Sequence, residues 1–340
     1  MIVISTIYDV AKEAGVSPST VSRVLNNYSN VTYETEVKVK KACKKLDYII
    51  NANASNLKSG KTKTLAVFIP DIVNPFFTSV LKGFENKSLE NRYNTIVCDT
   101  DESQEKELNY INMILEKRIE GVVIATVSKD NSHIKKIQDH GVPVVLLDRK
   151  IKNINADIIC SNNREGAAKL VNHLINNGRK RIAIIAAPLY LSTSRERLEG
   201  YKKALEGNNI EVRDEFIKID NESEGFSTEN AYEMTKELLN INPRPDSIFV
   251  VNNLMAMEVY KALKEEGIEV PKDIAIVCFD DLNLVYEMDP FFTIMKQPDY
   301  TMGEVAAEVL IDRIEGNYNN SFRKVEFKSE LIVRRSSLEK

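Results

Sequence analysis

The sequence contains no tryptophan and is poor in cysteine and histidine, with four cysteines and three histidines in 340 residues. The cysteines stand far apart, at Cys43, Cys98, Cys160 and Cys278. Without a Cys-x-x-Cys pair, this spacing excludes a cysteine zinc site and a disulfide framework, and predicts buried free thiols in a reducing cytoplasm. Two histidines, His133 and His140, lie near one face of a predicted helix, but no third ligand joins them. We therefore expect surface histidines, no metal site and no cofactor.

Long apolar runs are also missing. No segment is long enough to span a membrane, and Met1–Ile4 is too short for the apolar core of a signal peptide. We therefore expect a cytoplasmic protein with no membrane partner. The hydrophobic share of 43% and the chain length are sufficient for two or three domains with buried cores.

The net charge of −4 excludes a molecule that binds nucleic acid with its whole surface. The charge is unevenly distributed, because residues 1–63 contain ten Lys/Arg and five Asp/Glu, a balance of +5, and the remainder therefore carries −9. A basic N-terminal part on an acidic body is typical of a protein that binds phosphates with one end.

Residues 7–26 predict two short amphipathic helices folded around one turn. Their apolar sides face each other, with Val10, Ala11 and Ala14 on the first helix and Val21, Val24 and Leu25 on the second. Gly15 suits a left-handed turn, and Ser17 with Pro18 suits the start of the second helix. The outward side of that helix carries Ser19, Thr20, Ser22 and Arg23. A packed helix pair alone would also fit a structural hairpin, but short hydroxyls and an arginine suit contact with phosphates and base edges.

This segment resembles the DNA-reading headpiece of the LacI/GalR (lactose-repressor) family of bacterial transcription regulators. The resemblance implies a three-helix helix-turn-helix headpiece over residues 1–50, with a third helix near Tyr33–Leu46, and a hinge helix or linker over residues 51–63. The DNA contacts that it implies fall on Thr6, Ser17, Pro18, Ser19, Thr20, Ser22, Arg23, Asn26, Tyr48, Asn51, Ala54 and Leu57. In the family, the leucine at Leu57 wedges between central base pairs from the minor groove. The chain departs from the family pattern at Ile50 and Ser55, where proline and arginine are common.

From Thr64 onward, short β-branched runs alternate with amphipathic helices. Strand–helix alternation predicts parallel sheets covered on both faces by helices, and hence an α/β fold. The alternation occurs twice, and Leu81-Lys82-Gly83-Phe84 in the first set is matched by Leu198-Glu199-Gly200-Tyr201 in the second. We therefore expect two similar α/β lobes that face each other across a ligand-binding cleft.

The body resembles the two-lobed, periplasmic-binding-protein-like α/β core of the same family over nearly its whole length. The matching segments include Pro70–Phe77, Asp148-Arg149, Arg197–Tyr201, Asn252–Ala256, Phe279–Asp281 and Lys296–Pro298. The resemblance implies a core over residues 64–340 that binds an effector and forms a dimer. Lobe 1 would cover about 64–160 and 294–325, and lobe 2 about 161–293 and 326–335. Two further departures are Asn253, where the family usually has aspartate, and Cys278, where it usually has glycine.

Polar side chains at strand ends and helix starts supply the hydrogen-bond partners that sugar hydroxyls require, and aromatic rings supply apolar walls. The residues expected to bind the effector are Asp71, Asn74, Phe76, Phe77, Asp148, Arg197, Phe226, Asn252, Asp280 and Gln297. For each phenylalanine the alternative is an ordinary core position. For each carboxylate the alternative is a helix cap or a salt bridge between lobes. Asp281 is expected to be structural.

Together these features predict a DNA-binding transcription regulator, a repressor of carbohydrate-utilisation genes that binds a palindromic operator as a homodimer and responds to a sugar-like effector. A sugar receptor for transport would need a signal peptide and no DNA-binding head. An enzyme is disfavoured because no catalytic residue set is present, and Asp280 and Asp281 are adjacent on one loop rather than opposed across a bond.

The alternative within the family is a catabolite-control-type regulator that responds to a phosphorylated carrier protein. That branch carries methionine where this chain has Pro18 and arginine where it has Glu308, and it lacks Asp148-Arg149. An acidic side chain at Glu308 would repel a phosphoserine. These residues favour a dedicated sugar regulator.

Overall fold

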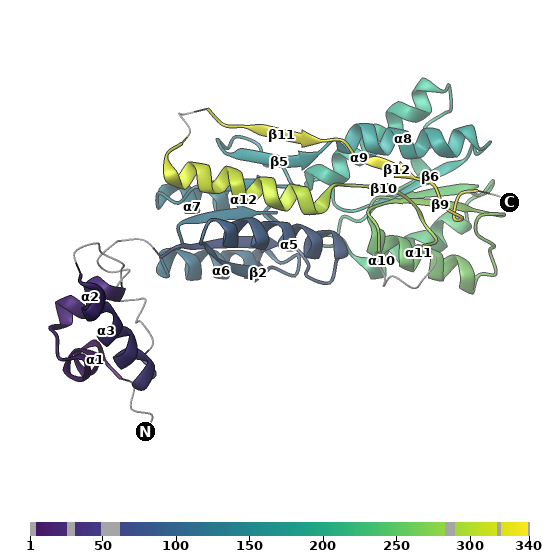
Figure 1. Ribbon diagram of the computed structural model, residues 1–340. Coiled ribbons are helices and arrows are strands. Elements are labelled where there is room, and N and C mark those ends of the chain that lie inside the picture. The colour runs from purple at the N-terminus through teal and green to yellow at the C-terminus, as the bar shows by residue number, and fades with distance from the viewer. Residues whose placement is uncertain (1–4, 26–30, 49–61, 283–289, 318–320, 339–340) are drawn as a thin grey trace. The chain divides into compact units, whose positions relative to one another are not determined.

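The computed structural model describes residues 5–25, 31–48, 62–282, 290–317 and 321–338 (Figure 1). The chain divides into two compact units, residues 1–62 and residues 63–340. Most of the predicted linker and the predicted contacts at Asn26, Asn51, Ala54 and Leu57 lie outside the described residues. Within the described ranges, no helix combines the length and the apolar composition that crossing a bilayer requires.

The N-terminal unit is a three-helix domain around a small apolar core. Its helices are α1 (Ile7–Ala14), α2 (Pro18–Leu25) and α3 (Tyr33–Lys45). Thr6 and Asp9 form a capping box at the start of α1, and Gly15 ends that helix with a left-handed φ of 66°. The buried core residues are Val10, Ala11, Val21, Val24, Val39 and Ala42. The predicted helix pair, its turn and the third helix are confirmed.

The described part of the C-terminal unit contains two six-stranded sheets. The first has the order β11-β5-β4-β3-β1-β2, all pairs parallel, with strands β1 (Thr64–Ile69), β2 (Asn94–Asp99), β3 (Gly121–Ile124), β4 (Val144–Leu147), β5 (Asp157–Ser161) and β11 (Lys324–Phe327). The second has the order β12-β10-β9-β8-β6-β7, with β12 antiparallel, and strands β6 (Ile182–Ala186), β7 (Ile217–Ile219), β8 (Ser247–Val250), β9 (Ala275–Phe279), β10 (Thr293–Lys296) and β12 (Glu330–Ile332). Each strand of one sheet therefore has a counterpart in the other, as the repeated sequence pattern predicts.

The first sheet and its helices form lobe 1, in which helices cover both faces of the sheet (Figure 1). Helices α5 (Pro75–Glu90) and α12 (Asp299–Glu315) cover one face, and α6 (Gln104–Glu116) and α7 (Ser132–Asp139) cover the other. Leu65 and Val67 of β1 point to the first pair, whereas Ala66 and Phe68 point to the second, because successive strand residues alternate between faces.

The second sheet and its helices form lobe 2, which is built around one continuous apolar core. Its helices are α8 (Asn163–Asn176), α9 (Ser192–Gly207), α10 (Thr228–Leu239) and α11 (Asn253–Glu265), with a short 3-10 turn at Asp214–Phe216. Helix α8 packs along α9, and α10 packs along α11. The predicted fold class, an α/β core of two similar lobes behind a helix-turn-helix headpiece, is confirmed.

Within the described residues, the chain crosses between the lobes three times, at Asn162, at Gln297-Pro298 and at Lys328-Ser329. The boundaries expected at residues 294 and 326 are corrected, because β10 pairs with β9 in lobe 2 and β11 pairs with β5 in lobe 1. The second crossing lies after β10 because proline cannot donate to a sheet ladder but suits the start of a helix. As a result, α8 follows a strand of lobe 1 yet packs in lobe 2, and α12 does the reverse.

The repeated glycines make this exchange of helices possible. A Cβ at Gly83 would lie 2.0 Å from the carbonyl oxygen of Tyr300 in α12, and a Cβ at Gly200 would lie 2.3 Å from that of Arg164 in α8. Both distances are far below van der Waals contact, so only glycine lets α5 approach α12, and α9 approach α8, this closely.

Gly200→Ala should therefore destabilise the folded core by about 1–3 kcal/mol, because α8 and α9 must separate to admit the methyl group. Gly207→Ala in the same helix is the matched control, since a Cβ there meets nothing within 4 Å. Urea unfolding followed by far-UV circular dichroism measures both variants. Equal midpoints for the two variants and the parent would show that close packing of α8 on α9 adds nothing to stability.

Candidate functional site

Two aspartates lie at equivalent strand ends of the two lobes. Asp148 follows β4 and Asp280 follows β9, and these strands hold the same position in their sheets. Both residues have left-handed backbone angles, with φ of 59° at Asp148 and 65° at Asp280. A non-glycine residue in this region costs about 1 kcal/mol or more, and such strain is concentrated at functional sites. The two positions are therefore held by their surroundings rather than by local preference.

The guanidinium of Arg197 from α9 interacts with both carboxylates and is buried with them. Its Nε donates to Asn163 Oδ1 at 2.8 Å and its Nη1 donates to the carbonyl oxygen of Val251 at 2.6 Å. Burial lowers the pKa of Arg197, and the nearby charges of Asp280 and Asp148 only partly restore it. Asp148, Arg197 and Asp280 thus form one buried electrostatic unit.

Burial raises the pKa of Asp280 to about 7, against the charge of Arg197 and a hydrogen bond that Gln297 Nε2 donates at 2.8 Å. Burial also raises the pKa of Asp148, and the charges of Arg197 and Arg149 oppose that rise only in part. In both residues the cause is the loss of water around a carboxylate. Asp280 therefore lies between its charged and neutral forms near neutral pH.

Five buried polar atoms around this unit have no hydrogen-bond partner among the described residues. They are Asp148 Oδ1, Arg149 Nε, Tyr190 Oη, Thr193 Oγ1 and Gln297 Oε1. Buried polar atoms are normally paired, so a group of unpaired ones marks a place for a polar ligand or for water. The carboxylate and amide oxygens accept, the guanidinium nitrogen donates, and the two hydroxyls do either. This set suits a ligand with several hydroxyl groups.

These atoms come together because the end of β4 is bonded to the first turn of α9 across the lobe boundary. The Lys150 amide donates to Ser192 Oγ at 2.7 Å, which brings the Asp148 segment against the Thr193 segment. Arg149 is fixed by a bidentate pair with Glu102, at 2.8 and 2.5 Å.

The ring of Phe226, from lobe 2, lies beside that pair. Its centroid is 5.5 Å from Cζ of Arg149. Phe226 is only partly buried, so it supplies an aromatic face at this edge of the site.

Three predicted effector residues are engaged in local hydrogen bonds. Asn74 Oδ1 caps α5 by accepting from an amide at 3.0 Å, and Asn252 Oδ1 caps α11 by accepting from two amides at 2.8 and 3.2 Å. Asp71 Oδ1 accepts from the amide two residues onward at 2.7 Å. The sequence left capping open only for the carboxylates, so the caps at Asn74 and Asn252 were not predicted. Asn253 Nδ2 joins the two helix starts by donating to Asn74 Oδ1 at 3.3 Å across the lobe boundary.

The phenylalanines of α5 lie in the core of lobe 1. Phe76 and Phe77 are buried and form an edge-to-face pair with ring centroids 4.9 Å apart. They therefore occupy the core position that the sequence left open for them, in the first turn of a helix that packs on the sheet, and a contact with the effector stays a prediction. Asp281, expected to be structural, accepts from both Nη atoms of Arg334 at 2.9 and 2.6 Å.

Sequence reasoning missed Arg149, Tyr190 and Thr193 as members of this site. A signal was available for two of them, because the repeat makes β6 the counterpart of β1. The loop after β1 supplied Asp71 and Asn74 to the prediction. The equivalent loop after β6 contains Tyr190 and leads to Thr193 at the start of α9.

His133 is not a surface histidine as expected. Its Nδ1 lies 2.7 Å from Oε1 of Glu107, whose side chain is fully buried. Glu107 also accepts from the Thr126 hydroxyl at 2.8 Å and from the Val127 amide at 2.7 Å. This cluster ties α6 and α7 to the loop after β3, a long-range contact that periodicity does not reveal.

The predicted DNA-binding residues of α2 form an exposed polar surface. Ser17 Oγ caps the helix by accepting from the Thr20 amide at 3.2 Å, and it lies 2.8 Å from the hydroxyl of Ser19. Arg23 is exposed, and Pro18 and Ser22 are partly exposed.

Two other predicted contacts of the headpiece have structural partners. The Thr6 hydroxyl donates to Asp9 Oδ2 at 2.7 Å within the capping box, and Tyr48 packs partly buried against the headpiece core. Tyr8 was not predicted, yet it exposes 71% of its surface on α1. A tyrosine hydroxyl is a common donor to DNA phosphates, so this exposed ring adds a further candidate contact to those of α2.

Both units match known protein families. The family described as "Bacterial regulatory proteins, lacI family" matches residues 6–51. The family described as "Periplasmic binding proteins and sugar binding domain of LacI family" matches residues 62–332. The two matches cover the described headpiece and nearly all of the two-lobed core.

Two curated relatives are similar over almost the whole chain. The HTH-type transcriptional repressor PurR of Photobacterium profundum is 32% identical over 98% of this chain and 98% of its own length. Catabolite control protein A of Priestia megaterium is 34% identical over 90% of this chain and 91% of its own length.

Solved structures share the same architecture. The lac repressor dimer bound to operator and the anti-inducer ONPF is 25% identical, with a TM-score of 0.84 over 99% of this chain and 100% of that chain. The complex of the transcriptional regulator CelR with cellobiose is 26% identical, with a TM-score of 0.74 over 98% of this chain and 99% of that chain.

The raised pKa of Asp280 predicts that stability declines as the pH rises. In the unfolded chain this carboxyl titrates at about 3.9, so between about pH 4 and 7 the folded protein binds more protons and loses stability with each step in pH. Asp280→Asn should therefore flatten the decline in Tm between pH 5 and 7.5, measured by differential scanning fluorimetry.

Asp281→Asn is the control for this experiment. Burial raises the pKa of Asp281, but the hydrogen bonds and charge of Arg334 outweigh it and leave the pKa below its ordinary value. This variant should leave the decline in place. A pH profile of Asp280→Asn that coincides with the parent would contradict the assignment.

Proposed function

The chain belongs to the LacI family of bacterial regulatory proteins, and on that premise we propose that it represses carbohydrate-utilisation genes in response to a neutral sugar. The relatives that it matches are transcriptional regulators and not enzymes. In this proposal a homodimer binds a palindromic operator with its two headpieces. The sugar binds between the lobes and changes their relative angle, which changes operator affinity.

The observation that carries the sugar proposal is the group of five unpaired buried atoms at the facing strand ends. A sugar hydroxyl donates and accepts, so one ligand can satisfy Asp148 Oδ1, Gln297 Oε1 and Thr193 Oγ1 together. A phosphate or carboxylate would bring only acceptors and a further negative charge into a site with two buried aspartates. The match to a regulator solved with cellobiose supports the same ligand class.

The headpiece supports the DNA part of the proposal. Residues 1–63 carry a balance of +5, and α2 presents small hydroxyls with the exposed Arg23. This combination allows close approach to phosphates and bidentate contact with guanine. A lac repressor structure bound to operator matches 99% of the chain.

A second candidate is a regulator controlled by a phosphorylated carrier protein, which the 34% identity to catabolite control protein A favours. Glu308 weighs against it, because this acidic side chain is exposed on α12. A phosphorylated serine approaching that helix would meet a like charge.

Arg23→Ala should weaken operator binding about 5- to 150-fold, because an arginine that binds guanine through two hydrogen bonds contributes about 1–3 kcal/mol. Lys38→Ala is the matched headpiece control, since Lys38 is paired with Glu34 at 2.8 Å on α3, and it should change the affinity less than threefold. Fluorescence anisotropy on labelled palindromic DNA with a central CG step measures both. Equal losses in the two variants would mean that Arg23 contributes only charge.

Titration of the operator complex with free and phosphorylated sugars, disaccharides and sugar acids tests the effector class. At least one neutral sugar should shift operator affinity tenfold or more, which is about 1.4 kcal/mol of coupling. Its phosphorylated form should have no effect. A response only to phosphorylated sugars would overturn the neutral-sugar proposal, and a response only to a phosphorylated carrier protein would favour the second candidate.

Thr193→Val should raise the concentration of that sugar needed for a half-maximal response about tenfold, because it removes one buried hydroxyl without changing the side-chain shape. Thr301→Val, at an exposed position of α12, is the control and should leave the response unchanged. The same half-maximal concentration in the Thr193 variant and the parent would place the sugar elsewhere.

A further inference from the structure

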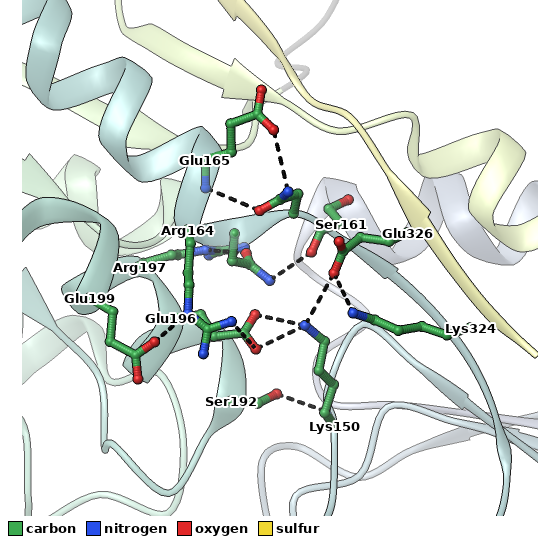
Figure 2. Close-up of polar contacts among 12 residues, drawn as sticks. Lys150, Ser161, Arg164, Glu165, Ser192, Glu196, Arg197, Glu199, Lys324 and Glu326 are labelled. Atoms are coloured by element: carbon green, nitrogen blue, oxygen red, sulfur yellow. Dashed lines mark hydrogen bonds and ion pairs between the residues drawn. The ribbon is translucent and has the colours of Figure 1, made fainter. Parts of the chain in front are cut away.

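A network of six charged side chains crosses the lobe boundary beside the site (Figure 2). Lys150 follows β4 in lobe 1, and its Nζ donates to both carboxylate oxygens of Glu196 in α9 of lobe 2, at 2.8 and 2.8 Å. The same Nζ lies 3.7 Å from Oε1 of Glu326 in β11. The Lys150 backbone amide also donates to Ser192 Oγ at 2.7 Å. One residue of lobe 1 is thus bound to lobe 2 through both its main chain and its side chain.

The network continues within each lobe. In lobe 1, Lys324 pairs with Glu326 at 2.8 Å. In lobe 2, Arg164 lies 3.6 Å from Glu196 and donates to Glu199. Three cations therefore meet three carboxylates, and Lys150–Glu196 is the link between the two halves.

The link lies beside two of the three crossings of the chain. Arg164 comes two residues after the crossing at Asn162, and Glu326 comes two residues before the crossing at Lys328-Ser329. The two crossings are bonded side by side, because the Asn162 amide donates to the carbonyl oxygen of Phe327 at 2.9 Å. Any change in the angle between the lobes must bend these segments, so the network is placed where it opposes that change.

Because the Lys150–Glu196 pair is largely buried, breaking it costs more free energy than breaking an exposed surface pair. Glu196 exposes only 5% of its surface, and the Lys150 side chain exposes 18%. A carboxylate held out of water depends on its cation, and loss of that cation leaves an uncompensated buried charge. Without Lys150, Glu196 would keep only Arg164, whose guanidinium lies 3.6 Å away, and separation of the lobes would return the carboxylate to water, so the open arrangement would be favoured.

We propose that Lys150 is a positioning residue that holds the lobes together through Glu196 and thereby sets their relative angle before any effector binds. Lys150 is two residues from Asp148, and Glu196 is one helical turn from Thr193, so the link also holds the two halves of the ligand site together. This proposal concerns the lobes themselves, and only its consequence for operator affinity rests on the proposed function.

The test compares Lys150→Met with two variants that break pairs inside one lobe. Lys324→Met removes a pair within lobe 1, and Glu199→Gln weakens a pair within lobe 2. The full-length protein without effector is examined by small-angle X-ray scattering and by hydrogen–deuterium exchange. Lys150→Met should increase the radius of gyration and speed exchange at least tenfold in the first turn of α9 and at residues 160–164. The two controls should stay within twofold of the parent.

Two further measurements keep the proposal falsifiable. Glu196→Gln keeps the size of the side chain and removes the charge that Lys150 binds, so it should weaken the link and open the lobes even if Lys150→Met does not fold. Unchanged scattering and exchange in every folded variant at either position would overturn the proposal. Operator affinity is then measured on labelled palindromic DNA, where Lys150→Met and Glu196→Gln should each change it fivefold or more and the two controls should not. If the parent protein does not bind operator DNA at all, the proposed function is refuted, but the scattering and exchange results still test the link between the lobes.

Discussion

The central constraint of this molecule is the burial of one guanidinium between two carboxylates at the meeting point of its lobes. Arg197 uses two donors inside lobe 2, so it neutralises Asp148 and Asp280 only through space. Burial away from water raises the pKa of Asp280 to about 7, and the negative charge of Asp148 adds to that rise. A buried group with unpaired acceptors is unfavourable until something supplies donors. The protein alone therefore leaves several buried polar atoms of this region without partners, which supports the proposed binding of a hydroxyl-rich ligand.

The symmetry of the fold produces that meeting point. Two sheets with the same strand order place the ends of β4 and β9 at equivalent positions, and each strand is followed by an aspartate with a left-handed backbone. The exchange of α8 and α12 then joins the lobes by three crossings rather than by one flexible linker. Multiple parallel connections permit hinge bending but restrict sliding, so a ligand can change the angle between the lobes while the strand ends stay opposed.

Features that depend on residues close together in the sequence can be predicted from it, whereas features that depend on distant contacts cannot. The helix pair, the α/β alternation and the repeat around Gly83 and Gly200 are local patterns of period and turn chemistry, and the structure confirms the fold class that they predict. The crossings at residues 297 and 328 differ from the predicted boundaries because a strand of only four residues has the same pattern whichever sheet it joins. β5 is not predicted as a strand, since Asp157–Ser161 begins with a buried carboxylate that pairs with Arg313 far along the chain.

The candidate site also combines local features, which the sequence predicts, with long-range contacts, which it does not. Asp148 and Asp280 are predictable because they follow predicted strands, whereas the place of Arg149 depends on its contact with Glu102, 47 positions away. The Lys150–Glu196 pair is also long-range, and it opposes the same opening that would admit a ligand. A ligand can shift such an equilibrium only by the difference in its affinity for the two arrangements. In the proposed mechanism, the Lys150–Glu196 pair next to the ligand site therefore sets how large the ligand's difference in affinity for the two lobe arrangements must be. The charge network opposes opening of the lobes, whereas the unpaired acceptors favour the arrangement that binds the ligand.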